Sequence, residues 1–254
     1  MKNIIEFIKS KPEIKSILNW FNNGEETYIN NTNEDNALLV LLSIFYQSNE
    51  SIFVVTPNLF KAQQLYDKLS KVLEPDEISF YPQDEFLTNE LLVSSIEFRL
   101  ERINTIIKIL AKTKRIIITN LYGLLKPQLS PEKWKDAKIT FKSGQEYNLD
   151  LIKAKLIEYG YKNEYTVEKI GDFAVRGGII DIFPVNSSVP YRLDFFGEEL
   201  EKIKTFDIDT QKSIDIKESF DTFPITDFFY SDNELSVLIE IIKQKTKANK
   251  FSED

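Results

Sequence analysis

The amino-acid sequence predicts an α/β protein in which a lobe with a parallel sheet is followed by a mixed α+β domain. Up to about residue 125, short β-branched runs alternate with segments of helical apolar spacing, which is typical of a parallel sheet with crossover helices. After Lys126-Pro127 the pattern becomes strand after strand, separated by glycine and asparagine turns. The 254 residues, 42% of them hydrophobic, suffice for one large domain or two ordinary ones.

The helices and strands of the first half follow from caps and periodicity. Asn33 or Asp35 can cap a helix that continues to about Gln47 and is apolar on nearly every side, as buried helices are. The run from Ser51 to Thr56 predicts a strand covered on both faces. The remaining expected elements are a helix after Asn58, a strand at 78–81, a helix at 96–110 and a strand at 115–119.

The second half is expected to begin with a strand at 139–141 and a short helix at 149–159, and to continue as strands from Tyr165 to about Phe220. Gly177-Gly178 separates two β-branched or aromatic runs and predicts a two-residue hairpin. A type I′ turn is expected there because it needs positive φ at both positions. A final helix is expected at about 233–243.

Composition excludes several classes of site. The chain has no Cys and no His, which removes thiol chemistry, disulfides, zinc sites and histidine general bases. The net charge of −8 argues against autonomous DNA binding, since duplex DNA attracts clustered Lys and Arg. No stretch of about 18 apolar residues is present, so we expect a soluble, cytoplasmic protein without membrane contact.

The N-terminal order of strand, loop and helix is typical of a nucleotide-binding lobe, but the loop is degenerate. A phosphate loop needs glycines, a Lys and a Ser or Thr around the phosphates. The corresponding stretch, Tyr28 to Ala37, has no Gly and no Lys and adds two carboxylates. We therefore expect a degenerate RecA-like, P-loop-like lobe with no cofactor and no catalytic residue.

Three acidic groups could in principle serve as metal ligands. They are Asp84-Glu85, Glu198-Glu199 and Asp207 to Asp209. Asp84-Glu85 follows Tyr81-Pro82-Gln83 rather than a hydrophobic strand end, so a capping or surface role is favoured over that of a Walker B pair. The other two are interpreted as solvated turns, and no metal site is expected.

One constellation indicates a protein interface. In a strand from Tyr191 to Phe196, Arg192, Asp194 and Phe196 share a face, and Arg176 ends the first arm of the glycine hairpin. Arg and aromatic residues are enriched at interface hot spots. The alternative is that Phe196 packs under a neighbouring loop while Arg192 pairs with Asp194 or Glu198. The pattern alone favours this structural alternative.

The same residues carry a resemblance to a known family. Three blocks resemble the second domain shared by UvrB and the transcription–repair coupling factor (Mfd) family: Phe173-Ala-Val-Arg-Gly-Gly-Ile-Ile-Asp-Ile-Phe-Pro184, Pro190-Tyr-Arg-Leu-Asp-Phe-Phe-Gly-Glu-Glu-Leu-Glu201 and Thr205-Phe-Asp-Ile-Asp-Thr-Gln-Lys-Ser213. Residues 52–69 and 81–102 resemble the first lobe of the coupling factors more loosely. UvrB keeps an intact Walker A loop, which this sequence lacks, so the coupling factor family is the better match.

The resemblance implies a function and a residue set. In the family, the second domain docks on the excision-repair subunit UvrA, and the residues implicated fall on Arg176, Arg192 and Phe196. With the resemblance, the interface role is favoured for these three. The resemblance implies a first lobe at 1–125, an inserted UvrA-interaction domain resembling domain 2 of UvrB at 126–206 and a return segment to the first lobe at 207–254.

The resemblance also implies that the chain is one piece of a longer protein. The motor domains that hydrolyse ATP with Mg²⁺, translocate on DNA and displace stalled RNA polymerase would lie in other parts of that protein. The chain itself is then a binding module rather than an enzyme. A nucleotide-dependent, UvrB-like DNA remodelling fragment is the alternative.

Overall fold

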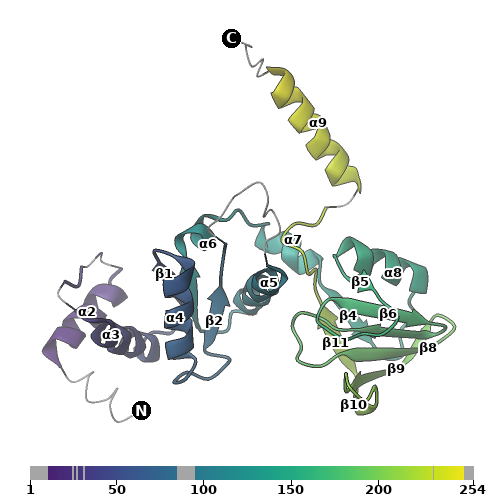
Figure 1. The fold of residues 1–254 in the computed structure, drawn as a ribbon, viewed down its shortest axis with the longest axis horizontal. Coiled ribbons are helices and arrows are strands. Elements are labelled where there is room, and N and C mark those ends of the chain that lie inside the picture. The colour runs from purple at the N-terminus through teal and green to yellow at the C-terminus, as the bar shows by residue number, and fades with distance from the viewer. Residues whose placement is uncertain are drawn as a thin grey trace. The chain divides into compact units, whose positions relative to one another are not determined.

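The computed structural model describes residues 11–24, 26, 28–30, 32–84, 95–230 and 232–248. The chain divides into two compact units, residues 1–127 and 128–254, which are considered separately below (Figure 1). Glu85 and the residues after 248 lie outside the described part of the chain.

The first unit begins with helices α2 (Pro12–Asn22) and α3 (Glu34–Gln47). Asn33 caps α3 as predicted, because its side chain accepts a hydrogen bond from the Asn36 amide at 2.8 Å. The expectation that α3 is buried on nearly every side is wrong: Leu42, Ser43 and Phe45 are buried, and the first turn is exposed. Residues 28–30, where a nucleotide-binding lobe would have its first strand, are in neither helix nor strand.

The sheet of the first unit has three parallel strands in the order β1-β3-β2, which confirms the predicted parallel pairing. The strands are β1 (Ile52–Thr56), β2 (Ile78–Tyr81) and β3 (Ile116–Asn120). The helices that follow them are α4 (Leu59–Leu69), α5 (Ile96–Leu110) and α6 (Leu121–Leu125).

The core of this unit lies on one side of β1. Ile52 and Val54 of β1 pack on a buried cluster that contains Leu42, Phe45, Ala62, Leu69, Leu73, Ile78, Phe80, Ile116 and Ile118. The expectation that β1 is covered on both faces is wrong, since Phe53 and Val55 are 53% and 41% exposed. The central strand β3 is buried throughout, whereas β1 lies at the edge of the sheet and leaves alternate side chains open.

The second unit combines a large, mostly antiparallel sheet with three helices among its described residues. Its helices are α7 (Pro131–Asp136), α8 (Leu149–Glu158) and α9 (Asp232–Ala248). Its strands are β4 (Ile139–Lys142), β5 (Lys162–Asn163), β6 (Asp172–Arg176), β7 (Ile179–Ile182), β8 (Tyr191–Phe196), β9 (Glu199–Phe206), β10 (Ser213–Lys217) and β11 (Ser219–Thr222). The predicted mixed α+β character of this half is confirmed.

Six strands follow the order β10-β9-β8-β7-β6-β5, and β11 pairs with β4 in a separate ribbon (Figure 1). One face of the sheet carries the fully buried side chains of Phe173, Ile180, Leu193 and Ile203. Residues 213–222 pair with β9 and β4 of this unit. The predicted boundary at 206/207 remains a prediction. No helix in the described ranges is long and apolar enough to cross a membrane.

The Gly177-Gly178 turn joins β6 to β7 as predicted, but its conformation differs from the expected type I′. Only Gly177 has positive φ, at +60°, which fits a type II′ turn. Gly178 is needed for another reason: a Cβ there would lie 2.7 Å from the carbonyl oxygen of Phe195. The Phe195 amide also donates to the Gly178 carbonyl at 2.7 Å, so the turn is held against the end of β8.

This close approach predicts the effect of two substitutions. Gly177→Ala should lower the free energy of unfolding by about 1–2 kcal/mol, the cost of positive φ, because open space surrounds the position. Gly178→Ala should cost more, since its methyl group meets a backbone oxygen that can move only with β8. Urea unfolding followed by the fluorescence of Trp134, which is buried in this unit, measures both. Equal losses would contradict the packing described here.

Candidate functional site

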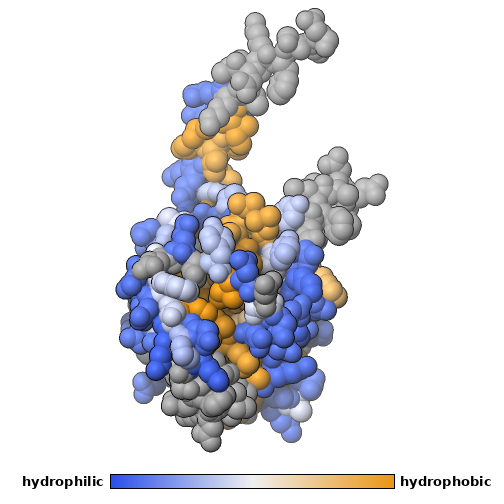
Figure 2. Space-filling view, turned by 90° about the vertical axis from the view of Figure 1, so that its left-hand side faces the viewer, coloured by the Kyte–Doolittle hydropathy of each residue, from blue (hydrophilic) through white to orange (hydrophobic). Residues whose placement is uncertain are grey.

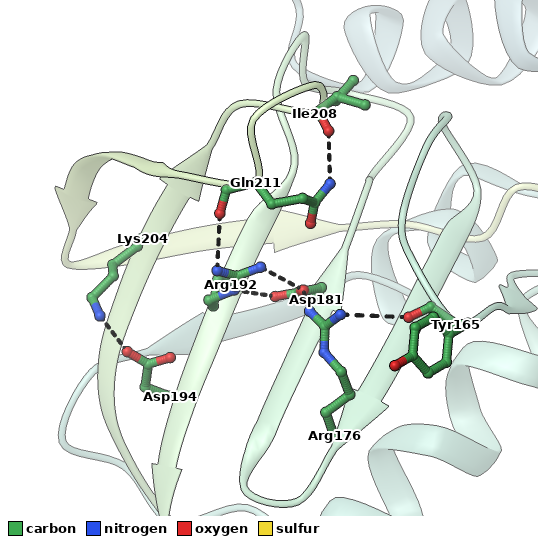
Figure 3. A network of polar contacts seen from close by, with 8 residues as sticks. All are labelled: Tyr165, Arg176, Asp181, Arg192, Asp194, Lys204, Ile208 and Gln211. Carbon is green, nitrogen blue, oxygen red and sulfur yellow. Dashed lines mark hydrogen bonds and ion pairs between the residues drawn. The ribbon is translucent and has the colours of Figure 1, made fainter.

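The candidate site lies on the polar face of the six-stranded sheet, the side that carries Asp181, Arg192 and Asp194. The register pairs Asp181 of β7 with Arg192 of β8, and Ile179 with Asp194. Residues directly opposite in antiparallel strands share a face, so Arg192 lies beside the Asp181 carboxylate. Arg176 is the last residue of β6 and pairs with Ile179. Its side chain contacts the Asp181 carboxylate from the side opposite to Arg192 (Figure 3).

Asp181 holds both arginines. Its side chain is fully buried, and Arg192 binds it through Nε to Oδ1 at 2.7 Å and through Nη2 to Oδ2 at 2.8 Å. The Nη2 group of Arg176 binds Oδ2 as well. A buried carboxylate is stable only when its oxygens are paired in this way. The two arginines and their shared counter-ion therefore carry a net charge of +1.

Arg192 is the more constrained of the two arginines. Its side chain is 17% exposed, its Nη1 donates to the carbonyl of Gln211 at 3.3 Å, and its guanidinium lies 4.6 Å from the ring centre of Phe206. The hydrogen bonds with Asp181 are the main cause that raises the pKa of Arg192 above its usual value. Few of its donors remain for a second protein.

Arg176 is the more accessible of the two. Its side chain is 38% exposed, and within the described ranges it bonds to Asp181 and, at the long distance of 3.5 Å, to the carbonyl of Tyr165. Figure 3 shows its guanidinium between Asp181 and Tyr165 at the margin of the polar face. Arg176 can therefore turn to an external carboxylate while Arg192 keeps Asp181 paired.

Phe196 supplies an apolar group at the end of β8. It is 76% exposed, and strand alternation places it on the same face as Asp194. The alternative that it packs under a neighbouring loop is wrong. The predicted pairing of Arg192 with Asp194 or Glu198 is also wrong, because Asp181 takes Arg192 and Lys204 takes Asp194. The Gly178 carbonyl accepts from the Phe195 amide, so the hairpin turn is held at the end of β8.

The degenerate loop of the first unit has its own ion pairs. Glu34, in the first turn of α3, accepts from Lys61 at 3.1 Å and from Lys68 at 2.9 Å, both on α4. The hydrogen bonds from these lysines lower the pKa of Glu34. In a working phosphate loop, a phosphate would lie at this helix end. Here a carboxylate of the chain lies there instead.

A cavity of about 450 Å³ opens next to Glu34. Most of its lining is apolar and comes from α3, β1 and α4, with Leu38, Leu41, Val54 and Leu65 among the residues. Figure 2 faces this unit and shows apolar side chains gathered between hydrophilic ones. Lys61 and Lys68 at its rim are paired with Glu34, so the cavity offers little to bind a triphosphate.

The acidic groups singled out in the sequence are in local hydrogen bonds where they are described. Asp84 accepts from the Ser95 amide at 3.4 Å, and Asp207 accepts from the amide and hydroxyl of Thr210. The Thr210 contacts lower the pKa of Asp207. Among the described residues, no three acidic side chains form a group that could hold a metal ion.

Comparison with known proteins gives the second unit a family. Residues 139–228 match the UvrB interaction domain, which covers β4 to β11 and includes Arg176, Arg192 and Phe196. The second unit carries a UvrB interaction domain. The mixed α+β part of the fold prediction agrees with this domain, and the RecA-like detail of the first lobe remains a prediction.

The whole chain is similar to transcription-repair-coupling factors, which confirms the resemblance seen in the sequence. It is 30% identical to that of Bacillus subtilis over its full length, and 34% identical to that of Staphylococcus aureus over 78% of its length. The chain spans 22% and 17% of these relatives, about a fifth of each. It is thus a UvrB-like module of the coupling-factor type.

Sequence reasoning found the three candidate residues but missed Asp181, which organises two of them. A signal was present: Asp181 is the lone charge in Ile179-Ile180-Asp181-Ile182, a strand whose other side chains are all apolar. A carboxylate in such a strand needs a cation from a neighbouring strand. The pairing with Arg192 depends on the β7–β8 register, which the sequence pattern did not specify.

The unequal burial of the arginines predicts unequal effects on stability. Arg192→Ala should lower the free energy of unfolding by about 3 kcal/mol, because it leaves the buried Asp181 carboxylate with a single partner. Arg176→Ala should cost less than about 1 kcal/mol, since that pair is partly exposed and Arg192 remains. Urea unfolding of both variants distinguishes them, and a larger loss for Arg176→Ala would contradict this assignment.

Proposed function

We propose that this chain recruits UvrA in transcription-coupled nucleotide excision repair. The observation that carries the proposal is that the exposed Phe196 and the partly exposed Arg176 lie on the same face of the sheet, in a UvrB interaction domain. Exposed aromatic rings and guanidinium groups on one surface are the residues that dominate binding energy at many protein interfaces. The names of the relatives, transcription-repair-coupling factor, support the repair context.

The three candidate residues have different roles in this proposal. Phe196 fills an apolar pocket on UvrA, and Arg176 gives a charge-assisted hydrogen bond to a carboxylate there. Arg192 contributes through its remaining donors and by keeping Asp181 paired. We propose that ATP hydrolysis, DNA translocation and displacement of RNA polymerase belong to other parts of the whole protein. The acidic chain would then add weak DNA binding or none.

Titration of the chain with purified UvrA tests the recruitment role. Phe196→Ala and Arg176→Ala should each weaken binding by about 30-fold, the equivalent of roughly 2 kcal/mol for a hot-spot residue. Matched controls are Phe60→Ala, which removes a ring that is 66% exposed on α4, and Lys153→Ala, which removes an exposed cation on α8. Absence of binding by the unmodified chain, or unchanged binding by Phe196→Ala, would overturn the proposal.

We also propose that the chain is not a nucleotide-dependent remodeller. Glu34 and its two lysines occupy the helix end where a phosphate would bind, and residues 28–37 include neither Gly nor Lys. Calorimetric titration with a non-hydrolysable ATP analogue and Mg²⁺ should give no heat of binding at micromolar concentrations. UvrB, with its intact Walker A loop, is the positive control. Micromolar binding by this chain would restore the enzyme alternative.

A further inference from the structure

The two arginines of the candidate site share one counter-ion that is inaccessible to a partner. Asp181 is fully buried and accepts three hydrogen bonds from guanidinium groups, two from Arg192 and one from Arg176. Nothing outside the chain can reach this carboxylate. Any effect of Asp181 on binding must therefore pass through the two arginines that it holds.

We propose that Asp181 is a positioning residue for the partner surface, an inference that rests on the proposed recruitment of UvrA. Bidentate pairing fixes the plane of the Arg192 guanidinium, because a planar fork and a carboxylate match in only one orientation. An arginine that is already ordered loses less side-chain entropy when it meets a partner.

The sharing of one oxygen makes Arg176 the arginine that moves. Oδ2 accepts from both arginines, whereas Oδ1 accepts from Arg192 alone. When Arg176 turns to a carboxylate on UvrA, Asp181 keeps both bonds to Arg192 and is not left as an unpaired buried charge. Arg192 thus stays with Asp181 in the free and bound states, and Arg176 exchanges one carboxylate for another.

Positioning and charge neutralisation predict opposite results for Asp181→Asn. This substitution keeps the shape of the side chain and raises the net charge of the three groups from +1 to +2. If Asp181 only reduced the attraction to an acidic partner surface, the variant would bind UvrA more tightly, mainly through faster association. If Asp181 positions the arginines, the variant dissociates faster and binds more weakly although its association rate is unchanged or higher.

The test is the binding kinetics of the whole chain with UvrA at two salt concentrations. Asp181→Asn should raise the dissociation rate constant and Kd about tenfold, without a slower association. In the Arg176→Ala/Arg192→Ala background, Asp181→Asn should have no further effect, because the residue acts through those side chains. A general loss of folding would instead weaken binding in every background, Phe196→Ala included.

A second variant keeps the inference testable if Asp181→Asn does not fold, as judged by circular dichroism and Trp134 fluorescence. Arg192→Lys keeps the charge but cannot form the bidentate pair. It should weaken UvrA binding nearly as much as Arg192→Ala, whereas a role for charge alone predicts binding close to that of the unmodified chain. The latter result would overturn the inference.

The outcomes separate this inference from the proposed function. If the unmodified chain binds UvrA, Phe196→Ala does not, and Asp181→Asn binds normally, Asp181 has no positioning role and the recruitment function stands. If Asp181→Asn weakens binding equally in the presence and absence of the two arginines, the inference is also overturned. If the unmodified chain does not bind UvrA, the recruitment function fails first and the inference fails with it.

Discussion

The polar face of the second unit depends on the buried carboxylate of Asp181. Desolvating a carboxylate costs several kcal/mol, and only close cations with good geometry offset that cost. Arg192 provides this compensation from the neighbouring strand and Arg176 from the hairpin end. The positions of both arginines are consequently set by the stability of the fold. The interface role that we propose for them uses an arrangement that the unit needs even when it is alone.

The hairpin and the strand register bring the parts of this face together. The Gly177-Gly178 turn lets β6 and β7 pair so that Arg176 and Asp181 face the same side, and Gly178 allows β8 to approach. The β7–β8 register then sets Arg192 against Asp181. A one-residue slip of either pair would turn one charge toward the apolar core, so the register is strongly determined. Phe196 lies at the end of β8, where its side chain is exposed.

Much of the fold could be predicted from the sequence because the signals are local. The cap at Asn33 and the helical spacing of apolar residues at 96–110 depend only on neighbours in the chain. Both helices, α3 and α5, form as predicted. The errors concern burial and the conformation of one turn. Phe53 and Val55 have the composition of a doubly covered strand, but their environment depends on which elements pack on β1. The sequence predicts a glycine at 178 for its backbone conformation, whereas the structure requires it because a Cβ there would meet the Phe195 carbonyl, 17 positions away.

The candidate site could be predicted in part for the same reason. Alternation along one strand identified Arg192 and Phe196, and the hairpin signal added Arg176. The partner of Arg192 could not be found, since the ion pair joins residues 11 positions apart through a register that no local pattern fixes. In the first unit, the missing Gly and Lys of residues 28–37 predict a degenerate phosphate loop. The ion pairs that Glu34 forms with Lys61 and Lys68 of α4 could be identified only in the structure.

Amide hydrogen exchange with and without UvrA would show whether UvrA docks on the polar face next to Phe196, as we propose. We expect slower exchange at residues 176–178 and 194–197 when UvrA is bound, with no change in α3 and α4 of the first unit. Protection confined to the first unit, or no protection at the end of β8 under saturating UvrA, would contradict it.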